Sequence, residues 1–326
     1  MRRPVLLAVS VDTEEDNWEP VRVGLTVENV RRLPRLASVL APLGLKPTFF
    51  VTHGVACTPW ALETVRQVAA ELGGEVGAHL HPWNTPPFDD RTPANDTMLN
   101  NYPRACQVAK LEVLTRRLSQ GLGARPTVFR AGRFGLGPET VSALLECEYR
   151  VDSSVTPFFS WRRYDNGPDF VGAPVHVYRL DGADDVRQPA RDGIIEVPIS
   201  AGYTRLAASH WFQLARLFAR RGSRRVHLAG IGARLGLVRR VILSPETNSV
   251  RDLLLLSRRL LEHEVEHLHL FFHSSSLTPG LTPFARDERG VQAIYRSIVA
   301  FVERLRDLAD VTTATISEVA RGAQAR

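Results

Sequence analysis

Short apolar segments alternate with amphipathic segments along most of this chain, and that alternation limits its fold more than any other feature. Residues 4–11, 47–51 and 75–78 form apolar runs that are too short for helices and rich in β-branched or small side chains. Between them, residues 28–43 and 61–72 carry apolar side chains at helical spacing. Strands joined by crossover helices lie parallel in one sheet. The N-terminal part of the chain therefore predicts an α/β fold.

The same alternation returns further along the chain. We expect further helices over residues 98–118, 138–147, 250–264 and 290–308, and further strands over residues 127–130, 149–151 and 267–272. A last strand and helix follow. At the start of that helix, Thr315 and Glu318 have the spacing of a capping box.

The alternation lapses between about residues 158 and 248, where Pro, Gly and Asp are frequent and residues 194–199 form one clear strand. A chain of 326 residues with a 44% apolar composition can fill one large barrel or two domains. We favour a single barrel over residues 1–326 with an inserted subdomain at about residues 158–248.

Two pairs of polar residues stand where predicted strands end. Asp12 and Glu14 close the first strand, and His79 and His81 close the third. Side chains two residues apart in a strand point the same way, so each pair is aimed at one spot. A carboxylate and two imidazoles at a common point suit a zinc-like site. The alternatives are that the acids cap a helix or lie in a solvated loop, and that His81, before a proline, belongs to a turn.

Five short segments stand at or near the ends of predicted strands: VDTEE (11–15), EVGAHLHPW (75–83), FRAGRFG (129–135), VDSSVTP (151–157) and FFHSSSLTPG (271–280). In this order they resemble the motifs of the polysaccharide deacetylase family, the carbohydrate esterase family 4 group. The resemblance spans most of the chain and leaves only the insertion unexplained. It implies a distorted (β/α) barrel and metal-dependent removal of an acetyl group from a carbohydrate.

The first two motifs of the family supply a base and metal ligands. The resemblance implies that Asp12 is the catalytic base and that Glu14, where the family usually has aspartate, is a metal ligand. It also implies His79 as a ligand. The family's other histidine stands four residues later, where this chain has tryptophan, so the nearest second imidazole is His81. His53 is the alternative ligand.

The other motifs supply groups that act on the base and on the leaving group. The resemblance places Arg130 beside the base, where an ion pair would lower the pKa of Asp12 and keep it ionised. It makes His273 the general acid and Asp152 the carboxylate that orients His273. These four residues form the expected catalytic set.

Four residues near the motifs are expected to bind substrate. Trp18 and Trp83 follow the two ligand pairs and suit the flat surfaces on which sugar rings stack, although a role in the core or at the rim stays open. Arg133 either contacts an acidic sugar or shapes a glycine-rich turn. Ser274 begins a run of hydroxyl residues that either lines the cleft or satisfies its own backbone.

The expected reaction is hydrolysis of an acetamide on a sugar. A cation held by two nitrogens and one oxygen favours zinc, while cobalt or nickel would also fit. Two other functions stay open: a metal-dependent hydrolase of small cyclic amides or imides, and a carbohydrate-binding protein without catalysis.

The chain has a formal charge of +6, and its arginines are densest between residues 216 and 240. This stretch fits a solvated face, or a peripheral contact with an anionic membrane or a phosphoglycan. Nucleic acid is not expected, because no binding motif accompanies the charge.

The compartment follows from the cysteines and the apolar segments. Cys57, Cys106 and Cys147 have no paired spacing, which indicates a reducing compartment. The first apolar run is too short for a signal peptide, and none is long enough to cross a bilayer. We therefore expect a cytoplasmic protein, with peripheral membrane contact left open. That location favours a nucleotide-linked or lipid-linked saccharide precursor of a surface polysaccharide as substrate.

Overall fold

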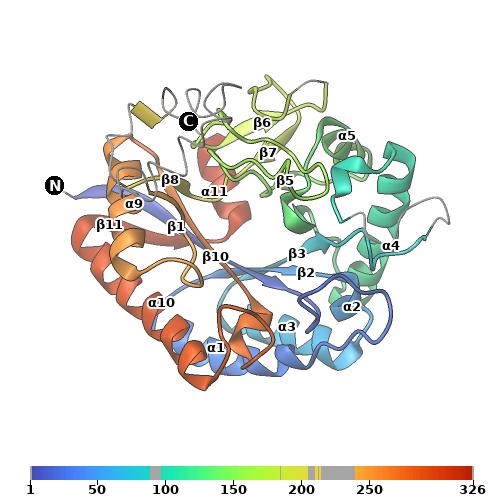
Figure 1. The fold of residues 1–326 in the computed structure, drawn as a ribbon, viewed down its shortest axis with the longest axis horizontal. Helices are drawn as coiled ribbons and strands as arrows, with labels where there is room; N and C mark the ends of the chain where they lie inside the picture. Colours follow the sequence, from blue (N-terminus) through green and yellow to red (C-terminus); the bar gives the residue numbers. More distant parts are fainter. Residues whose placement is uncertain are drawn as a thin grey trace.

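The computed structural model of the protein describes residues 2–88, 97–183, 185–204, 210–211, 213 and 239–324. Its centre is a curled, mostly parallel sheet that forms a half-barrel (Figure 1). The strands follow the order β10-β1-β2-β3-β4-β5-β7-β6, and β11 also pairs with β1. Among the described strand pairs of this sheet, only β6 and β7 are antiparallel. Their bounds are β1 Arg3–Thr13, β2 Pro47–Val51, β3 Glu75–Leu80, β4 Val128–Ala131, β5 Val151–Asp152, β6 Tyr178–Leu180, β7 Ile194–Glu196, β10 His267–His273 and β11 Ala309–Ala314.

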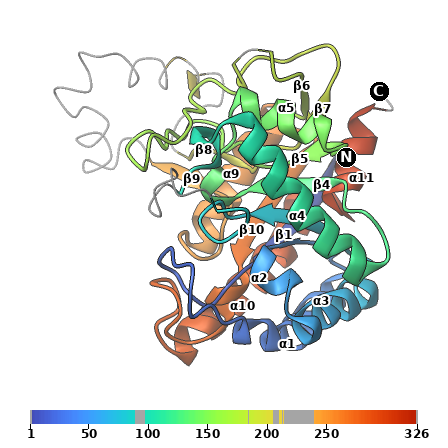
Figure 2. The same ribbon diagram turned by 90° about the vertical axis from the view of Figure 1, so that its right-hand side faces the viewer.

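Helices cover the outside of the sheet in a ring. In packing order they are α9 (Val250–Glu262), α10 (Glu288–Leu308), α1 (Leu33–Leu40), α3 (Pro59–Glu71), α4 (Arg104–Leu122) and α5 (Pro138–Glu146). Figure 2 shows the ring from the side of α4 and α5. Two further helices are α2 (His53–Ala56) and α11 (Ile316–Gln324).

The ends of several helices are fixed by side-chain caps. Asp287, before α10, accepts a hydrogen bond from the Gly290 N–H at 2.8 Å. The predicted capping box of α11 is also present: Thr315 N–H donates to Glu318 at 2.9 Å, and Glu318 N–H donates to Thr315 at 3.2 Å. Each cap satisfies backbone donors that have no partner inside the helix.

Prolines divide two segments that we expected to be continuous helices. The segment 28–43 is α1 flanked by two 3₁₀ turns, η1 (Glu28–Arg32) and η2 (Ala41–Leu43), with a proline near the start of α1 and another in η2. The segment 98–118 begins with the 3₁₀ turn η3 (Leu99–Asn101), and α4 starts only after Pro103. Proline disfavours helical backbone in the residue before it, and Tyr102, which precedes Pro103, is extended, so α4 starts only after this point. The prolines of the first segment have no N–H to donate to a helical hydrogen bond.

β1 is the longest strand and has three partners. On one side it pairs with β10 from Leu6 opposite His267 to Asp12 opposite His273. On the other side its first half, Arg3 to Ala8, pairs with β11, and its second half pairs with β2. The register of β1 with β10 therefore places Asp12 directly beside His273.

Part of the range 158–248, which we expected to be inserted, contributes to the barrel. β6 and β7 belong to the main sheet. A second, two-stranded sheet of β8 (Ala201–Tyr203) and β9 (Arg240–Ile242) follows. Backbone hydrogen bonds from Leu243 N–H to Ser200 O, 2.8 Å, and from Phe271 N–H to Leu243 O, 3.0 Å, link this region to β10. Residues 216–238 of the arginine-rich stretch lie outside the described residues.

Within the described part of the chain, no helix is both long enough and apolar enough to cross a membrane.

Candidate active site

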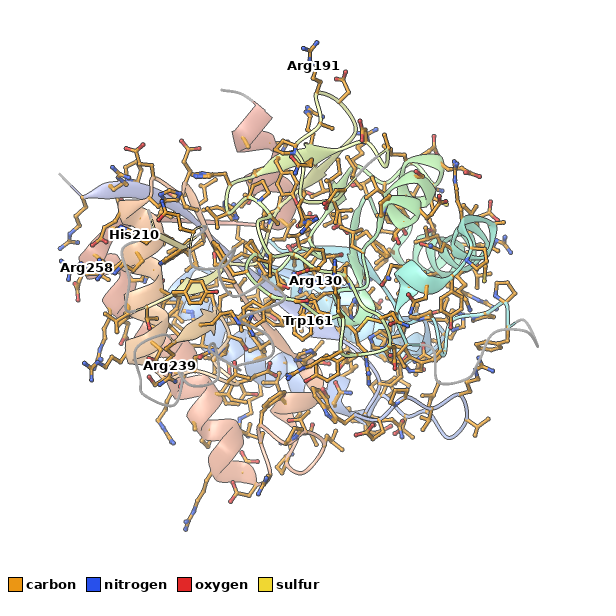
Figure 3. All side chains as sticks on the ribbon, turned by 45° about the horizontal axis from the view of Figure 1, so that its top comes forward. Arg130, Trp161, Arg191, His210, Arg239 and Arg258 are labelled. Carbon is orange, nitrogen blue, oxygen red and sulfur yellow. The ribbon has the colours of Figure 1, made fainter. Side chains whose placement is uncertain are left out.

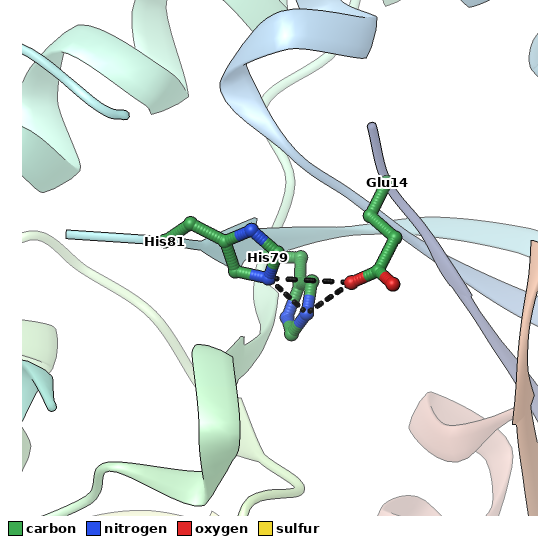
Figure 4. Close-up of side chains that lie close together, drawn as sticks. All are labelled: Glu14, His79 and His81. Carbon is green, nitrogen blue, oxygen red and sulfur yellow. Dashed lines mark hydrogen bonds and ion pairs between the residues drawn. The ribbon is translucent and has the colours of Figure 1, made fainter. Parts of the chain in front are cut away.

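Glu14, His79 and His81 converge at the end of the half-barrel where β1 and β3 finish (Figure 4). The two Nε2 atoms are 3.1 Å apart. Glu14 Oε2 lies 3.4 Å from His81 Nε2 and 4.0 Å from His79 Nε2. Ligand atoms about 2.0 to 2.1 Å from a tetrahedral zinc ion lie about 3.3 Å from one another. The spacing of the three atoms therefore suits a single cation.

The partners of the other ring nitrogens support this arrangement. His79 Nδ1 lies 3.0 Å from the carbonyl oxygen of Arg130, which can only accept, so His79 donates from Nδ1. His81 Nδ1 faces Glu15 Oε2 at 3.4 Å. With its proton on Nδ1, on the side of Glu15, His81 presents the lone pair of Nε2 to the same point as His79. Burial lowers the pKa of His79 to about 3, so its ring is neutral, as a metal ligand must be.

The surroundings of the three residues also favour a cation. Desolvation raises the pKa of Glu14, and the nearby carboxylates of Asp12 and Glu15 raise it further. A cation at this point would offset the repulsion among the three carboxylates. Gly132 leaves room for His81, because a Cβ atom at that position would lie 2.5 Å from the His81 ring. The donor set and its surroundings therefore fit a divalent cation held by Glu14, His79 and His81.

Arg130 holds Asp12 as expected. Its Nη1 donates to Asp12 Oδ1 at 2.5 Å, and its Nε donates to the carbonyl oxygen of Ser153 at 2.8 Å. Arg130 is fully buried, and it lies near the centre of the molecule in Figure 3. Burial alone would raise the pKa of Asp12, but the charges of Arg130 and His273, together with the hydrogen bond from Arg130, outweigh burial and lower it. Asp12 is therefore ionised and can accept a proton.

His273 is oriented by Glu246, a residue that the sequence analysis did not identify. His273 Nδ1 lies 3.0 Å from Glu246 Oε2, and its backbone N–H donates to Glu246 Oε1 at 3.1 Å. Burial would lower the pKa of His273, but the charges of Glu246 and Glu14 raise it to about 10. His273 Nε2 lies 3.9 Å from Asp12 Oδ2. A protonated imidazole therefore faces an ionised carboxylate across the site.

The expected role of Asp152 is wrong. Its carboxylate accepts hydrogen bonds from the Ser154 N–H at 3.0 Å and the Ser154 hydroxyl at 2.8 Å, and it stands opposite Glu196 in the sheet. Asp152 thus holds the backbone after β5 and does not orient His273. Glu14 directly follows β1, whereas residues 243–245 separate Glu246 from the end of β9, so the rule of polar residues at strand ends does not point to Glu246. The irregular range around it gave no clear strand.

Two further expectations change. His53, the alternative ligand, lies outside the group of three, and its Nε2 is 3.3 Å from Cys57 Sγ. Ser274 is buried, and its hydroxyl accepts a hydrogen bond from the Glu14 N–H at 3.2 Å. Ser274 therefore positions a ligand residue instead of lining the cleft.

A cavity of about 710 Å³ opens beside these groups, and Asp12, Glu14, His79, His81, Glu246 and His273 all line it. Trp18, Trp83 and Arg133, which we expected to bind substrate, also line it. Trp83 stacks on His81 with 4.2 Å between ring centroids, and Trp18 meets His273 edge to face at 5.5 Å. The cavity walls are therefore largely aromatic around a polar floor, which is the usual character of a small-molecule site.

Comparisons with known proteins bear on the fold. No protein-family model and no curated protein sequence matches the chain. A structure from Mycobacterium smegmatis described as a polysaccharide deacetylase matches with a TM-score of 0.54 and 17% identity, covering 100% of this chain and 96% of that one. A structure from Parabacteroides distasonis described as a glycoside hydrolase/deacetylase matches with a TM-score of 0.58 and 16% identity, covering 99% and 71%. The chain therefore has the fold of polysaccharide deacetylases, which confirms the predicted fold class.

Proposed function

We propose that this protein is a metal-dependent hydrolase that removes an N-acetyl group from a sugar. The convergence of Glu14, His79 and His81 beside Asp12 and His273 carries the proposal. Two nitrogens and one oxygen favour zinc, and cobalt or nickel would also suit this set. When bound, such a cation supplies Lewis-acid chemistry, because it acidifies water and polarises a carbonyl group.

In the proposed reaction, Asp12 removes a proton from the attacking water. The hydrogen bond from Arg130 keeps Asp12 ionised and fixes one of its oxygens, so the other oxygen, Oδ2, faces the cavity floor. Oδ2 lies 3.9 Å from His79 Nε2, on the side where the three ligand atoms meet. A base in this position is within reach of a water directed at an acyl carbon.

His273 completes the reaction by giving a proton to the departing nitrogen. An amine leaves poorly as an anion, so the collapse of the tetrahedral adduct needs a donor. Glu246 stabilises the charged imidazole and holds its Nδ1, which leaves Nε2 directed at the cavity. The products are acetate and a free amino sugar.

We further propose a cytoplasmic location. The support is that Cys57, Cys106 and Cys147 are all free thiols in the structure. Contact with a membrane or phosphoglycan through residues 216–240 remains a proposal from the sequence, since of that stretch only Arg239 and Arg240 are described.

The test joins metal analysis to acetate release. We expect purified protein to hold one divalent cation per chain and to release acetate from N-acetylated sugars. A His79→Ala/His81→Ala variant should lose both. A His176→Ala/His263→Ala variant is the matched control, since it removes two imidazoles whose rings pair at 5.8 Å and do not line the cavity.

Two results would contradict the proposal. The first is a cation that the His79→Ala/His81→Ala variant retains at full occupancy. The second is a metal-loaded protein that releases no acetate from any N-acetylated sugar while it opens cyclic amides or binds sugars without turnover.

A further inference from the structure

An unbroken row of aromatic rings leads away from His273 along the cavity wall. Phe271 meets His273 at 5.9 Å between centroids, and Phe134 meets Phe271 at 5.7 Å. Trp161 then packs on Phe134 at 5.2 Å and on Phe159 at 5.8 Å. All four aromatic residues line the cavity that holds the proposed catalytic groups. A single sugar ring at the cation would leave most of this wall uncovered.

Arg240 stands at the far end of this row. Its guanidinium carbon lies 4.2 Å from the centroid of the Phe159 ring, and Nη1 donates to the carbonyl oxygen of Phe158 at 2.9 Å. A guanidinium has five N–H donors, so others remain for a ligand. Within the ranges that the structure describes, no carboxylate forms an ion pair with Arg240, whereas its neighbour Arg239 pairs with Asp252 at 2.8 Å.

Arg133 adds a second cation to the same cavity. Its guanidinium carbon lies 5.4 Å from the centroid of the Trp83 ring, and it donates to the Thr97 hydroxyl at 3.2 Å. The acids of the cavity, by contrast, are Asp12, Glu14 and Glu246, which surround the proposed cation and His273. The cavity thus holds two arginines on aromatic rings in addition to its acidic floor.

We infer that the substrate is an acetamido sugar that carries a phosphate group, and that Arg240 binds this phosphate. The inference rests on the proposed deacetylase function and names its substrate class. A guanidinium on an aromatic face matches the planar, bidentate geometry of phosphate recognition. The aromatic row then packs against an apolar or flat group joined through the phosphate. A neutral polysaccharide would leave Arg240 without an anionic partner.

Two classes of compound contain such a phosphorylated sugar, the nucleoside diphosphate sugars and the prenyl diphosphate sugars. Both carry phosphate on the anomeric oxygen, and both place an apolar or aromatic group beyond it. The probes are therefore N-acetylglucosamine, its 1-phosphate, a uridine diphosphate ester and a short-chain prenyl diphosphate ester. Whichever of the two esters binds more tightly identifies the source.

The first measurement is binding to chelator-treated protein, which does not depend on turnover. We expect the 1-phosphate to bind about 10- to 100-fold more tightly than the neutral sugar, as a charge-assisted hydrogen bond would give. Arg240→Gln should remove most of this ratio. Arg239→Gln, which makes the same charge change at the next residue, should keep the wild-type ratio. The same ratios should appear in kcat/KM on the metal-loaded protein.

Equal binding of the neutral and phosphorylated sugars would overturn the inference, and so would an equal loss of the ratio in Arg239→Gln and Arg240→Gln. These outcomes are separate from failure of the proposed function. A protein that binds the 1-phosphate through Arg240 but releases no acetate would keep the phosphate site and refute the deacetylase.

Discussion

At the scale of single residues, the two candidate proton carriers are controlled by different partners. Arg130 keeps Asp12 ionised, and Glu246 keeps His273 protonated. The two groups lie 3.9 Å apart, Asp12 Oδ2 to His273 Nε2. The proposed reaction needs both charge states, because an ionised Asp12 can take a proton from water and a protonated His273 can give one to the departing amine.

Glu246→Gln should shift the alkaline limb of the pH–activity profile to lower pH. His273 must be protonated to act as the acid, so activity is lost as the pH rises through its pKa, which is about 10. Without the Glu246 charge, burial lowers that pKa, and protonation ends at a lower pH. The profile of kcat against pH measures the shift. Asp152→Asn is the control, because Asp152 contacts Ser154 and not His273. An unchanged limb in Glu246→Gln would refute the role of Glu246.

Gly132→Ala should weaken metal binding. The new methyl group would lie 2.5 Å from the His81 ring and 2.8 Å from the Leu80 carbonyl oxygen, so the ligand side chain must move. Overpacking of this kind costs about 1 to 3 kcal/mol. Calorimetric titration with zinc gives the affinity. Gly322→Ala in α11 is the matched control, since its nearest neighbour outside the helix is the Leu6 side chain at an ordinary 3.5 Å. Equal zinc affinities of the Gly132→Ala and Gly322→Ala variants would contradict the predicted clash between residue 132 and the His81 ring.

The convergence of Glu14, His79 and His81 was predictable from the sequence because it depends on local geometry. Glu14 and His81 follow buried strands, and His79 lies within one, so the side to which each points is set by the two-residue period of a strand. The partner of His273 could not be predicted in the same way. Glu246 reaches it from a range with no regular pattern, and Asp152 was chosen by resemblance, although β5 is only two residues long and directs it toward Glu196.

At the scale of elements, a buried lysine fixes the loop that follows β3. Lys110 in α4 donates to the carbonyl oxygens of Pro82, Thr85 and Pro87 at 3.0, 2.6 and 2.8 Å. The loop carries Trp83, which stacks on His81. Through these three bonds, α4 supports one wall of the cavity.

Lys110→Met should destabilise the fold and loosen the site. Three carbonyl oxygens lose a charged donor, which should cost about 2 to 4 kcal/mol of unfolding free energy. The Michaelis constant should rise, because Trp83 is no longer held. Denaturant unfolding and steady-state kinetics measure the two effects. Lys46→Met is the control, since the half-exposed pair of Lys46 with Glu318 at 3.2 Å contributes about 0 to 1 kcal/mol. A stability loss no larger than in Lys46→Met would refute the proposal that Lys110 holds the loop after β3.

Helices and strands could be told apart where the spacing of apolar residues is regular. The end of a helix could be predicted where a nearby side chain caps it. The capping box of Thr315 and Glu318 is an example, because both hydrogen bonds lie within one turn. The break before α4 was missed, since the apolar spacing runs across Pro103 and hides its effect on the backbone. β6 was missed as well, because its three residues gain stability only from pairing with β7.

At the scale of the whole molecule, the site joins strands from both ends of the described chain. The proposed ligands come from β3, from the residue after it and from the segment after β1, whereas His273 ends β10. A cation that binds only this assembled arrangement stabilises the entire fold by mass action.

Zinc should therefore raise the unfolding temperature of the wild-type protein. At a free concentration 100 times its dissociation constant, the expected gain is about 2.7 kcal/mol of unfolding free energy. Thermal unfolding with zinc and with chelator measures it. The His79→Ala/His81→Ala variant should show no gain, and the His176→Ala/His263→Ala variant should show the wild-type gain. The same shift in both variants would mean that zinc binds elsewhere.

The three-partner pairing of β1 has a consequence for how the protein folds during its synthesis. A ribosome delivers β1 before every other described strand, yet β10 and β11, which cover its flanks, emerge last of all. Until then one edge of β1 stays bare along the residues that will face β10, and Asp12 has no His273 to oppose it. The helices and strands near the N-terminus can pack earlier, but the candidate active site is complete only after β10 has been synthesised.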